Sequence, residues 1–228
     1  MRTILLLSLA FILSLLVANG QSIQSPDKKI TLNFSLTSAG EPTYSVTKEG
    51  KVIIEESKLG LLLKGQPSLE KGFILANSEI KTKDETWTPV WGEETQIRDQ
   101  HNELKVNLVQ PGEKSRIFQI TFRVFNDGLG FRYEIPEQPN LRSFIVSDEI
   151  TTFNLPNDPM TFWIPGDFNS NEYAYNHTRL SAIDASIGTT ENGIGAKTLI
   201  GKDFIQSPVM MKSDEGLYLS IFEAALYN

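Results

Sequence analysis

The chain has 228 residues, no cysteine and a formal net charge of −7 at pH 7. An acidic chain without a basic stripe is unsuited to a phosphate backbone, so we expect no nucleic-acid partner. The lack of cysteine excludes disulfides and thiolate zinc sites.

The N-terminus predicts a secretory signal peptide over residues 1–20. Arg2 precedes an apolar run from Ile4 to Val17, and the small residues Ala18 and Gly20 end the segment. The run is too short for a comfortable membrane span, and no basic stop-transfer cluster follows it. An uncleaved anchor is the alternative. We expect an exported, most naturally periplasmic protein without a membrane anchor, since a lipoprotein would need a cysteine at the cleavage site.

The rest of the chain, 21–228, alternates apolar and polar residues with a period of two. This alternation is typical of half-buried antiparallel strands. It is clearest in KITLNFSLT (29–37), ELKVNLV (103–109), RIFQITFRVF (116–125) and GLYLSIF (216–222).

Turn signals separate these segments, and sustained helical periodicity is absent from the sequence. They are KEGK (48–51), PGEK (111–114), NDGLG (126–130) and SDEG (213–216), of which NDG predicts the clearest hairpin. The best helical candidate is a short turn near SKLGLLL (57–63), weakened by Gly60. The pattern predicts an all-β fold, one large antiparallel β-sandwich over 21–228. Because FEAALYN (222–228) follows a strand without a polar tail, we expect that sandwich to be incomplete at its C-terminus.

Signatures of nucleophilic or nucleotide chemistry are missing from the sequence. There is no G-x-S-x-G, P-loop or cysteine, and His101 and His177 lie in polar stretches, where we expect solvated surface histidines. Glu93 and Glu94 are adjacent, which predicts a solvated loop or a pairing with Arg98 rather than a catalytic carboxylate pair.

One stretch, FWIPGDFNSNEYAYN (162–176), is rich in groups that a core does not need. Asp167, Asn169 and Asn171 imitate the first half of an EF-hand loop, but the glycine and the final glutamate of that motif are missing. Hard oxygen donors still suit calcium, and a plain Asx-turn loop is the alternative. Trp163 could stack on a sugar ring or fill the core between sheets.

Taken together, several stretches resemble the N-terminal region of the family-97 glycoside hydrolases, which include α-glucosidases and α-galactosidases. The resemblance covers the mature chain. Its most specific parts are DETWTPVWGEETQIRDQHNEL (84–104), FRVFNDGLGFRYEIP (122–136) and FWIPGDFNSNEYAYNHTRLS (162–181).

The resemblance implies a mutarotase-like super-sandwich that precedes a catalytic (β/α)₈ barrel. It implies an oligosaccharide substrate, catalytic acids on the barrel, and an active-site calcium ion with one glutamate ligand from the N-terminal domain. The matching position in NEY is Glu172. Trp163 and Asp167 are candidates to face substrate, although the family role is not carried onto them.

The chain ends before any barrel strand, so we expect a fragment of the parent hydrolase that is inactive alone. A stand-alone, non-catalytic sugar-binding module is the alternative. A mutarotase-type isomerase is a third hypothesis, but it would need His101 and His177 as acid and base.

Overall fold

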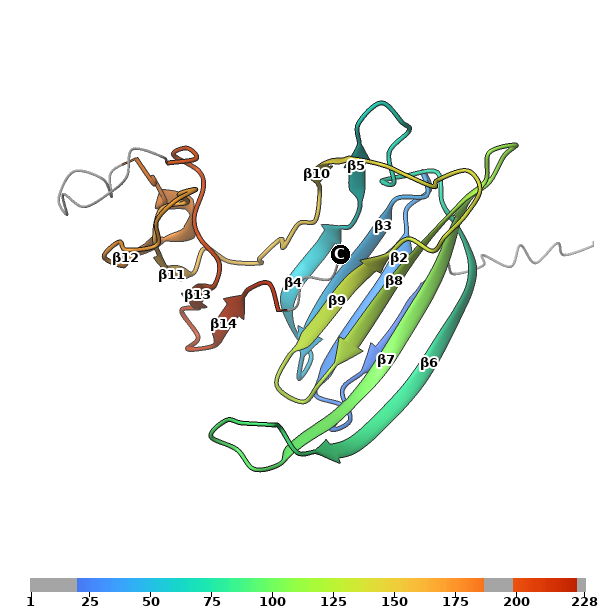
Figure 1. Ribbon diagram of the computed structural model, residues 1–228. Helices are drawn as coiled ribbons and strands as arrows, with labels where there is room; N and C mark the ends of the chain where they lie inside the picture. The colour runs from blue at the N-terminus through green and yellow to red at the C-terminus, as the bar shows by residue number, and fades with distance from the viewer. Residues whose placement is uncertain (1–19, 187–198, 225–228) are drawn as a thin grey trace, which may run out of the picture.

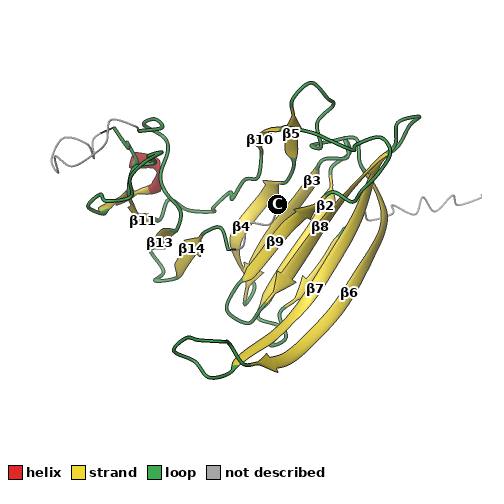
Figure 2. Ribbon diagram, viewed as in Figure 1, coloured by secondary structure: helices red, strands yellow, loops and turns green. Residues whose placement is uncertain are grey.

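Strands dominate the computed structural model, which describes residues 20–186 and 199–224 (Figure 2). The predicted signal peptide lies outside the described residues except for Gly20. Within the described ranges the one helical element is the 3₁₀ turn η1, Leu180–Ala182. Nothing helical in this part of the chain has the length and apolar character required to cross a membrane.

The first sheet is a four-stranded antiparallel meander in the order β1-β2-β3-β4. Its strands are β1 (Gln21–Gln24), β2 (Ile30–Leu36), β3 (Pro42–Lys48) and β4 (Lys51–Lys58). The predicted KEGK turn joins β3 to β4, with Glu49 and Gly50 at φ values of 51° and 82°. Two successive left-handed residues match the twist of the strands they join, so this turn prediction is confirmed.

The second sheet is also a four-stranded meander, in the order β6-β7-β8-β9. Its strands are β6 (Ile74–Trp87), β7 (Ile97–Gln110), β8 (Arg116–Val124) and β9 (Leu129–Glu134). The predicted NDG hairpin is confirmed: Val124 pairs with Leu129, and the Phe125 amide donates to the Gly128 carbonyl at 2.8 Å.

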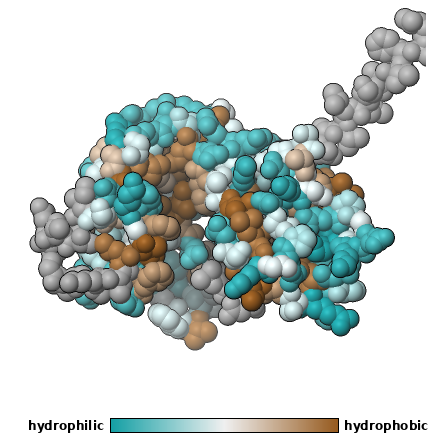
Figure 3. All heavy atoms as spheres, turned by 90° about the horizontal axis from the view of Figure 1, so that it is seen from above, coloured by the Kyte–Doolittle hydropathy of each residue, from teal (hydrophilic) through white to brown (hydrophobic). Residues whose placement is uncertain are grey.

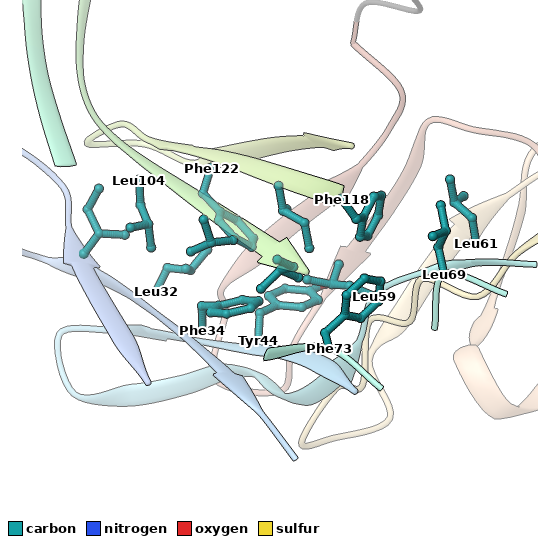
Figure 4. Packing of buried hydrophobic residues seen from close by; sticks show 14 of the residues in the cluster. Leu32, Phe34, Tyr44, Leu59, Leu61, Leu69, Phe73, Leu104, Phe118 and Phe122 are labelled. Carbon is teal, nitrogen blue, oxygen red and sulfur yellow. The ribbon is translucent and has the colours of Figure 1, made fainter. Parts of the chain in front are cut away.

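The core lies between these two sheets, which face each other as a sandwich (Figures 1 and 4). Aromatic rings cross the interface, for example Phe34 from β2 and Phe122 from β8, with ring centroids 6.0 Å apart. Of the alternating residues predicted to point inward in β2, β7 and β8, Leu36 is partly buried and the others are buried: Ile30, Leu32, Phe34, Leu104, Val106, Leu108, Phe118, Ile120, Phe122 and Val124. The all-β sandwich prediction is therefore confirmed.

The SKLGLLL stretch is extended, so the helical turn considered there is wrong. It runs from β4 through Gly60 into β5 (Leu61–Leu63), which pairs with β10 (Val146–Glu149). Gly60 has a φ of 151°, and a Cβ there would lie 2.7 Å from the Leu69 carbonyl oxygen. Pairing with a distant strand outweighs the weak local preference for a turn.

A third, smaller sheet lies beside the sandwich (Figure 1). Its order is β12-β11-β13-β14, and its strands are β11 (Met160–Trp163), β12 (Asn176–Arg179), β13 (Val209–Lys212) and β14 (Tyr218–Ile221). An ion pair of 2.7 Å between Lys51 and Glu215 connects it to the sandwich. Apolar side chains gather on both parts where they face the space between them (Figure 3). The alternating segment GLYLSIF (216–222) contains β14, so it belongs to this sheet rather than to the sandwich.

Candidate functional site

The loop after β11 starts from a tightly held backbone. The Gly166 amide donates to the Phe204 carbonyl at 2.7 Å, and the Ile200 amide donates to the Gly166 carbonyl at 2.9 Å. A Cβ at Gly166 would lie 3.0 Å from Cβ of Phe204, so any side chain would crowd this crossing. Residue 166 therefore fixes the place from which the loop leaves the small sheet.

Asp167 organises the loop through both of its carboxylate oxygens. Oδ1 accepts hydrogen bonds from the amides of Asn169 at 2.7 Å and Ser170 at 3.1 Å. Oδ2 accepts one from the Tyr173 hydroxyl at 2.6 Å, and this bond raises the pKa of Tyr173. The arrangement is an Asx turn closed by a second, longer contact, which is the supporting role considered from the sequence.

Glu172 lies on the exposed outer part of this loop. Its amide donates to the Ser170 hydroxyl oxygen at 3.2 Å, and the Gln206 side chain donates to the Ser170 carbonyl at 2.6 Å. The backbone on the N-terminal side of Glu172 is thus held, whereas its carboxylate has no hydrogen-bond or ion-pair partner among the described residues. A fixed backbone with an unengaged carboxylate is a suitable arrangement for donating to a ligand.

The described ranges contain no group of three or more histidine, aspartate or glutamate side chains that could hold a metal ion. Calcium takes six to eight oxygen ligands, so Glu172 fits as one contributor but not as a complete site. The expected calcium ion stays a prediction that would require ligands from outside this part of the chain.

Trp163, at the end of β11, is buried rather than exposed on the surface. The residue is 3% exposed, and its indole Nε1 donates to Oγ1 of Thr178 on the neighbouring strand at 3.0 Å. A sugar could not reach the indole face without displacing these contacts. The geometry therefore favours the packing role considered from the sequence, and a substrate contact stays a prediction for Trp163, as it does for Asp167.

A second feature of the small sheet is a hollow of about 470 Å³ on its open face. The hollow is lined by Phe162, Tyr175, Pro208, Met210, Ser220 and Phe222. The ring of Phe162 also stacks on that of His177 from β12, with ring centroids 4.2 Å apart. No carboxylate is among these lining residues, so the hollow suits an apolar surface better than a polyhydroxylated sugar.

The expectation for the histidines is wrong for His101 and holds for His177. His101 is 1% exposed and lies within β7, where its Nδ1 is 2.6 Å from Oδ1 of Asp99 and its ring lies 4.9 Å from that of Phe125. The sequence segment looked like a loop because polar residues surround it, but β7 continues through it. His177 is exposed on β12, so the two histidines lie on different sheets and form no acid–base pair.

Phe168 and Tyr175 of the 162–176 stretch are 76% and 66% exposed. Two tryptophans are also open to solvent, one at the end of β6 and one in the loop that joins β6 to β7. Trp91 is 88% exposed and Trp87 is 49% exposed, and Glu93 and Glu94 are exposed in the same loop. Arg98 pairs with Asp84 rather than with either of these glutamates. Sequence reasoning missed the two tryptophans, although Pro89 between them and Gly92 after the second indicated a turn.

Comparison with protein-family models identifies a match to "Glycosyl-hydrolase 97 N-terminal" over residues 23–228. A retaining alpha-galactosidase of Bacteroides thetaiotaomicron is 25% identical over 240 residues, covering 98% of this chain and 34% of the relative. A probable retaining alpha-galactosidase of Streptomyces bingchenggensis is 26% identical over 159 residues, covering 69% of this chain and 23% of the relative.

Solved structures give the same picture. A glycoside hydrolase family 97 enzyme from Pseudoalteromonas sp. strain K8, in complex with panose, superposes with a TM-score of 0.78 at 29% identity. The match covers 90% of this chain and 28% of that enzyme. A beta-arabinopyranosidase superposes with a TM-score of 0.72 at 21% identity, which bears on the fold alone. The chain thus spans about a third or less of the length of the proteins it matches.

Proposed function

This chain belongs to the glycosyl-hydrolase 97 N-terminal family, and we propose that it serves a family-97 glycoside hydrolase by supplying Glu172 to an active-site calcium ion. The remaining ligands and the catalytic acids would come from a (β/α)₈ barrel. The substrate would be an oligosaccharide with α-glucosidic or α-galactosidic bonds. The names of the relatives, two retaining alpha-galactosidases and an enzyme that binds panose, support this substrate class.

The observation that carries the proposal is the state of Glu172. Its carboxylate is exposed and unengaged, while Asp167, Ser170 and Gln206 hold the backbone of the same loop. A carboxylate needed for the fold would be paired or hydrogen-bonded, and one without a role would not need a braced loop. An exposed carboxylate on a fixed backbone can reach a neighbouring domain without a large loss of conformational entropy.

In this division of labour, the chain positions a ligand and the barrel performs the bond cleavage. A bound calcium ion would supply a positive charge that polarises the sugar and orients nearby carboxylates. Tyr173 and Asp167 would keep Glu172 at a constant distance from the interface. Because the chain would lack both catalytic carboxylates, we expect it to be inactive by itself on an aryl α-glucoside.

The test begins with the gene. An in-frame continuation after Asn228 that encodes a (β/α)₈ pattern would provide the complete enzyme, and a stop codon there would favour the stand-alone sugar-binding module instead. In the complete enzyme, Glu172→Ala should weaken calcium binding at least about tenfold, measured by isothermal titration calorimetry. Glu137→Ala, which removes an exposed carboxylate outside this loop, is the matched control. Unchanged calcium affinity in Glu172→Ala would contradict the proposal.

We also propose that the protein is exported through the segment 1–20. Arg2, the apolar run Ile4–Val17 and the small residues before Gln21 support this, together with the absence of cysteine. Expression in a bacterium with an outer membrane should release a periplasmic protein whose first residue is Gln21. N-terminal sequencing checks this, and an intact Met1 in the periplasmic fraction would contradict cleavage.

A further inference from the structure

The hairpin formed by β6 and β7 reaches beyond the rest of the sandwich. Both strands have 14 residues, whereas β8 has nine and pairs with β7 only from Asn102 to Gln110. Residues 97–101 of β7 therefore pair with β6 alone, as a two-stranded arm that carries the loop 88–96 (Figure 1). An isolated two-stranded ribbon is marginally stable, so this arm needs further bonds to hold a defined shape.

Side-chain bonds across the arm supply that stiffness. Arg98 on β7 forms a bidentate pair with Asp84 on β6, with N–O distances of 2.8 and 2.7 Å, and Gln100 adds a third bond to Asp84 at 3.2 Å. Lys83 on β6 reaches Asp99 on β7 at 2.9 Å, and Asp99 also bonds to His101. The bidentate geometry fixes both the distance and the angle between the strands.

The tip of this arm presents large apolar side chains to solvent. Val90 is 99% exposed and Trp91 is 88% exposed, with Trp87 half exposed at the base of the loop. Large apolar side chains this exposed on a braced projection indicate a contact site. The indole of Trp91 is therefore presented to something that the described residues do not include.

The polar groups around Trp91 indicate what this partner is. Thr88, Glu93 and Glu94 are exposed, and their side chains have no hydrogen-bond partner among the described residues. Tryptophan is enriched in protein–protein contacts, but glutamate is depleted at their centre, where a desolvated carboxylate is costly. The two carboxylates that follow Trp91 in the loop therefore distinguish this tip from the centre of a typical protein contact. A sugar ring offers an apolar C–H face for an indole and hydroxyl donors at its rim for carboxylates.

We propose that the tip of the β6–β7 hairpin is an oligosaccharide-binding site in which Trp91 stacks on a pyranose ring. Trp87 and Val90 extend the apolar platform, and Glu93, Glu94 and Thr88 accept hydrogen bonds from sugar hydroxyls. The choice of an oligosaccharide as the ligand rests on the substrate class given under the proposed function. It does not depend on calcium binding by Glu172. It would hold a substrate chain near the enzyme without taking part in the chemistry.

Tryptophan fluorescence of the purified protein tests this directly. Of the three tryptophans, Trp163 is 3% exposed, whereas Trp87 and Trp91 face solvent. Titration with maltotriose or melibiose should give a saturable fluorescence change, and Trp91→Ala should weaken the binding by about tenfold or more. Trp91→Phe, which keeps a flat ring, should retain part of the affinity. Binding is measured independently of fluorescence by calorimetry.

Tyr218→Ala is the matched control. It removes an aromatic side chain that is 59% exposed and lies on β14 of the small sheet, outside the β6–β7 hairpin. Its sugar affinity should equal that of the unaltered protein. Absence of saturable binding to either sugar would overturn the proposal. Sugar affinity that is unchanged in Trp91→Ala would also overturn it. The same holds if the unaltered protein self-associates but binds no sugar, and Trp91→Ala abolishes the self-association. Calcium binding by Glu172 is measured separately, so either idea can fail alone.

Discussion

The Tyr173 hydroxyl lies 2.6 Å from Oδ2 of Asp167, and this hydrogen bond closes the loop that presents Glu172. Asp167 is thereby bonded at both ends: its other oxygen holds two backbone amides at the start of the loop. A single aspartate thus sets the shape of a segment whose remaining side chains are mostly exposed.

Loss of this aspartate should loosen the loop without unfolding the protein. In Asp167→Ala, the amides of Asn169 and Ser170 lose their acceptor, so their hydrogen exchange should accelerate several-fold or more, whereas sandwich amides should not change. Hydrogen exchange read by mass spectrometry or NMR checks this. Asn171→Ala, whose side chain makes no hydrogen bond in the described structure, should leave exchange in the loop unaltered. Equal exchange in both variants would show that the Asx turn does not hold the loop.

The two histidines should differ sharply in their contribution to stability. His101→Ala removes a buried ring and leaves Asp99 without one of its partners, which should reduce the free energy of unfolding by about 2–4 kcal/mol. His177→Ala removes an exposed ring and should cost less than about 1 kcal/mol. Urea denaturation followed by circular dichroism measures both. Similar small losses would mean that His101 is not buried in solution.

Acid should destabilise the outer face of the second sheet through Glu134. Burial opposes ionisation of this carboxyl, but hydrogen bonds from Thr121, Lys105 and Arg132 outweigh it and lower its pKa from 4.5 to about 2. Because the pKa is lower in the folded state, the stabilisation is present above pH 4.5 and is lost as the pH falls towards 2.

Glu134→Gln should therefore lower the free energy of unfolding near neutral pH, by roughly 1–3 kcal/mol after allowance for solvent screening. The difference from the unaltered protein should shrink as the pH falls from 4.5 to 2. Denaturation at a series of pH values checks the slope. Glu137→Gln, exposed and unpaired among the described residues, is the control; a constant difference across this range would contradict the role given to Glu134.

The core prediction compares two residues on opposite faces of β8. Phe122 is completely buried and contacts the rings of Phe34 and Phe131, whereas Ile117 is 38% exposed. Phe122→Ala should cost about 3–5 kcal/mol of unfolding free energy, and Ile117→Ala about 1 kcal/mol or less. Thermal and urea unfolding measure the difference. If the order were reversed, the assignment of faces in this strand would be wrong.

Strand faces could be predicted because a period of two is a local property of the chain. In β2, β7 and β8 the residues predicted to point inward, such as Leu32, Leu104 and Phe118, are buried completely. Turns at KEGK and NDG followed from residues that favour turns, and left-handed backbone angles occur in the first of them, at Glu49 and Gly50. The N-terminal part of β7 was less accessible, because residues 98–102 are all polar and look like a loop in sequence, although they pair with β6.

The candidate site was likewise only partly predictable from the sequence. The oxygen-rich character of residues 167–172 is visible in the sequence, and so is the Asx turn that Asp167 makes. The exposure of each aromatic ring is not, because it depends on which segment covers it. Trp163 could equally have faced a sugar or the interior, and its burial, with the indole bonded to Thr178, favours the interior.

What the sequence by itself determined is the alternation in β2, β7 and β8, the inward faces of these strands and the family resemblance, since each of these depends on neighbouring residues along the chain. Only the tertiary structure decided that the small sheet is separate from the sandwich, that His101 is enclosed, and that Trp91 rather than Trp163 is open to solvent. Burial is a property of contacts between segments far apart in the chain, and local patterns carry no information on which segments those will be.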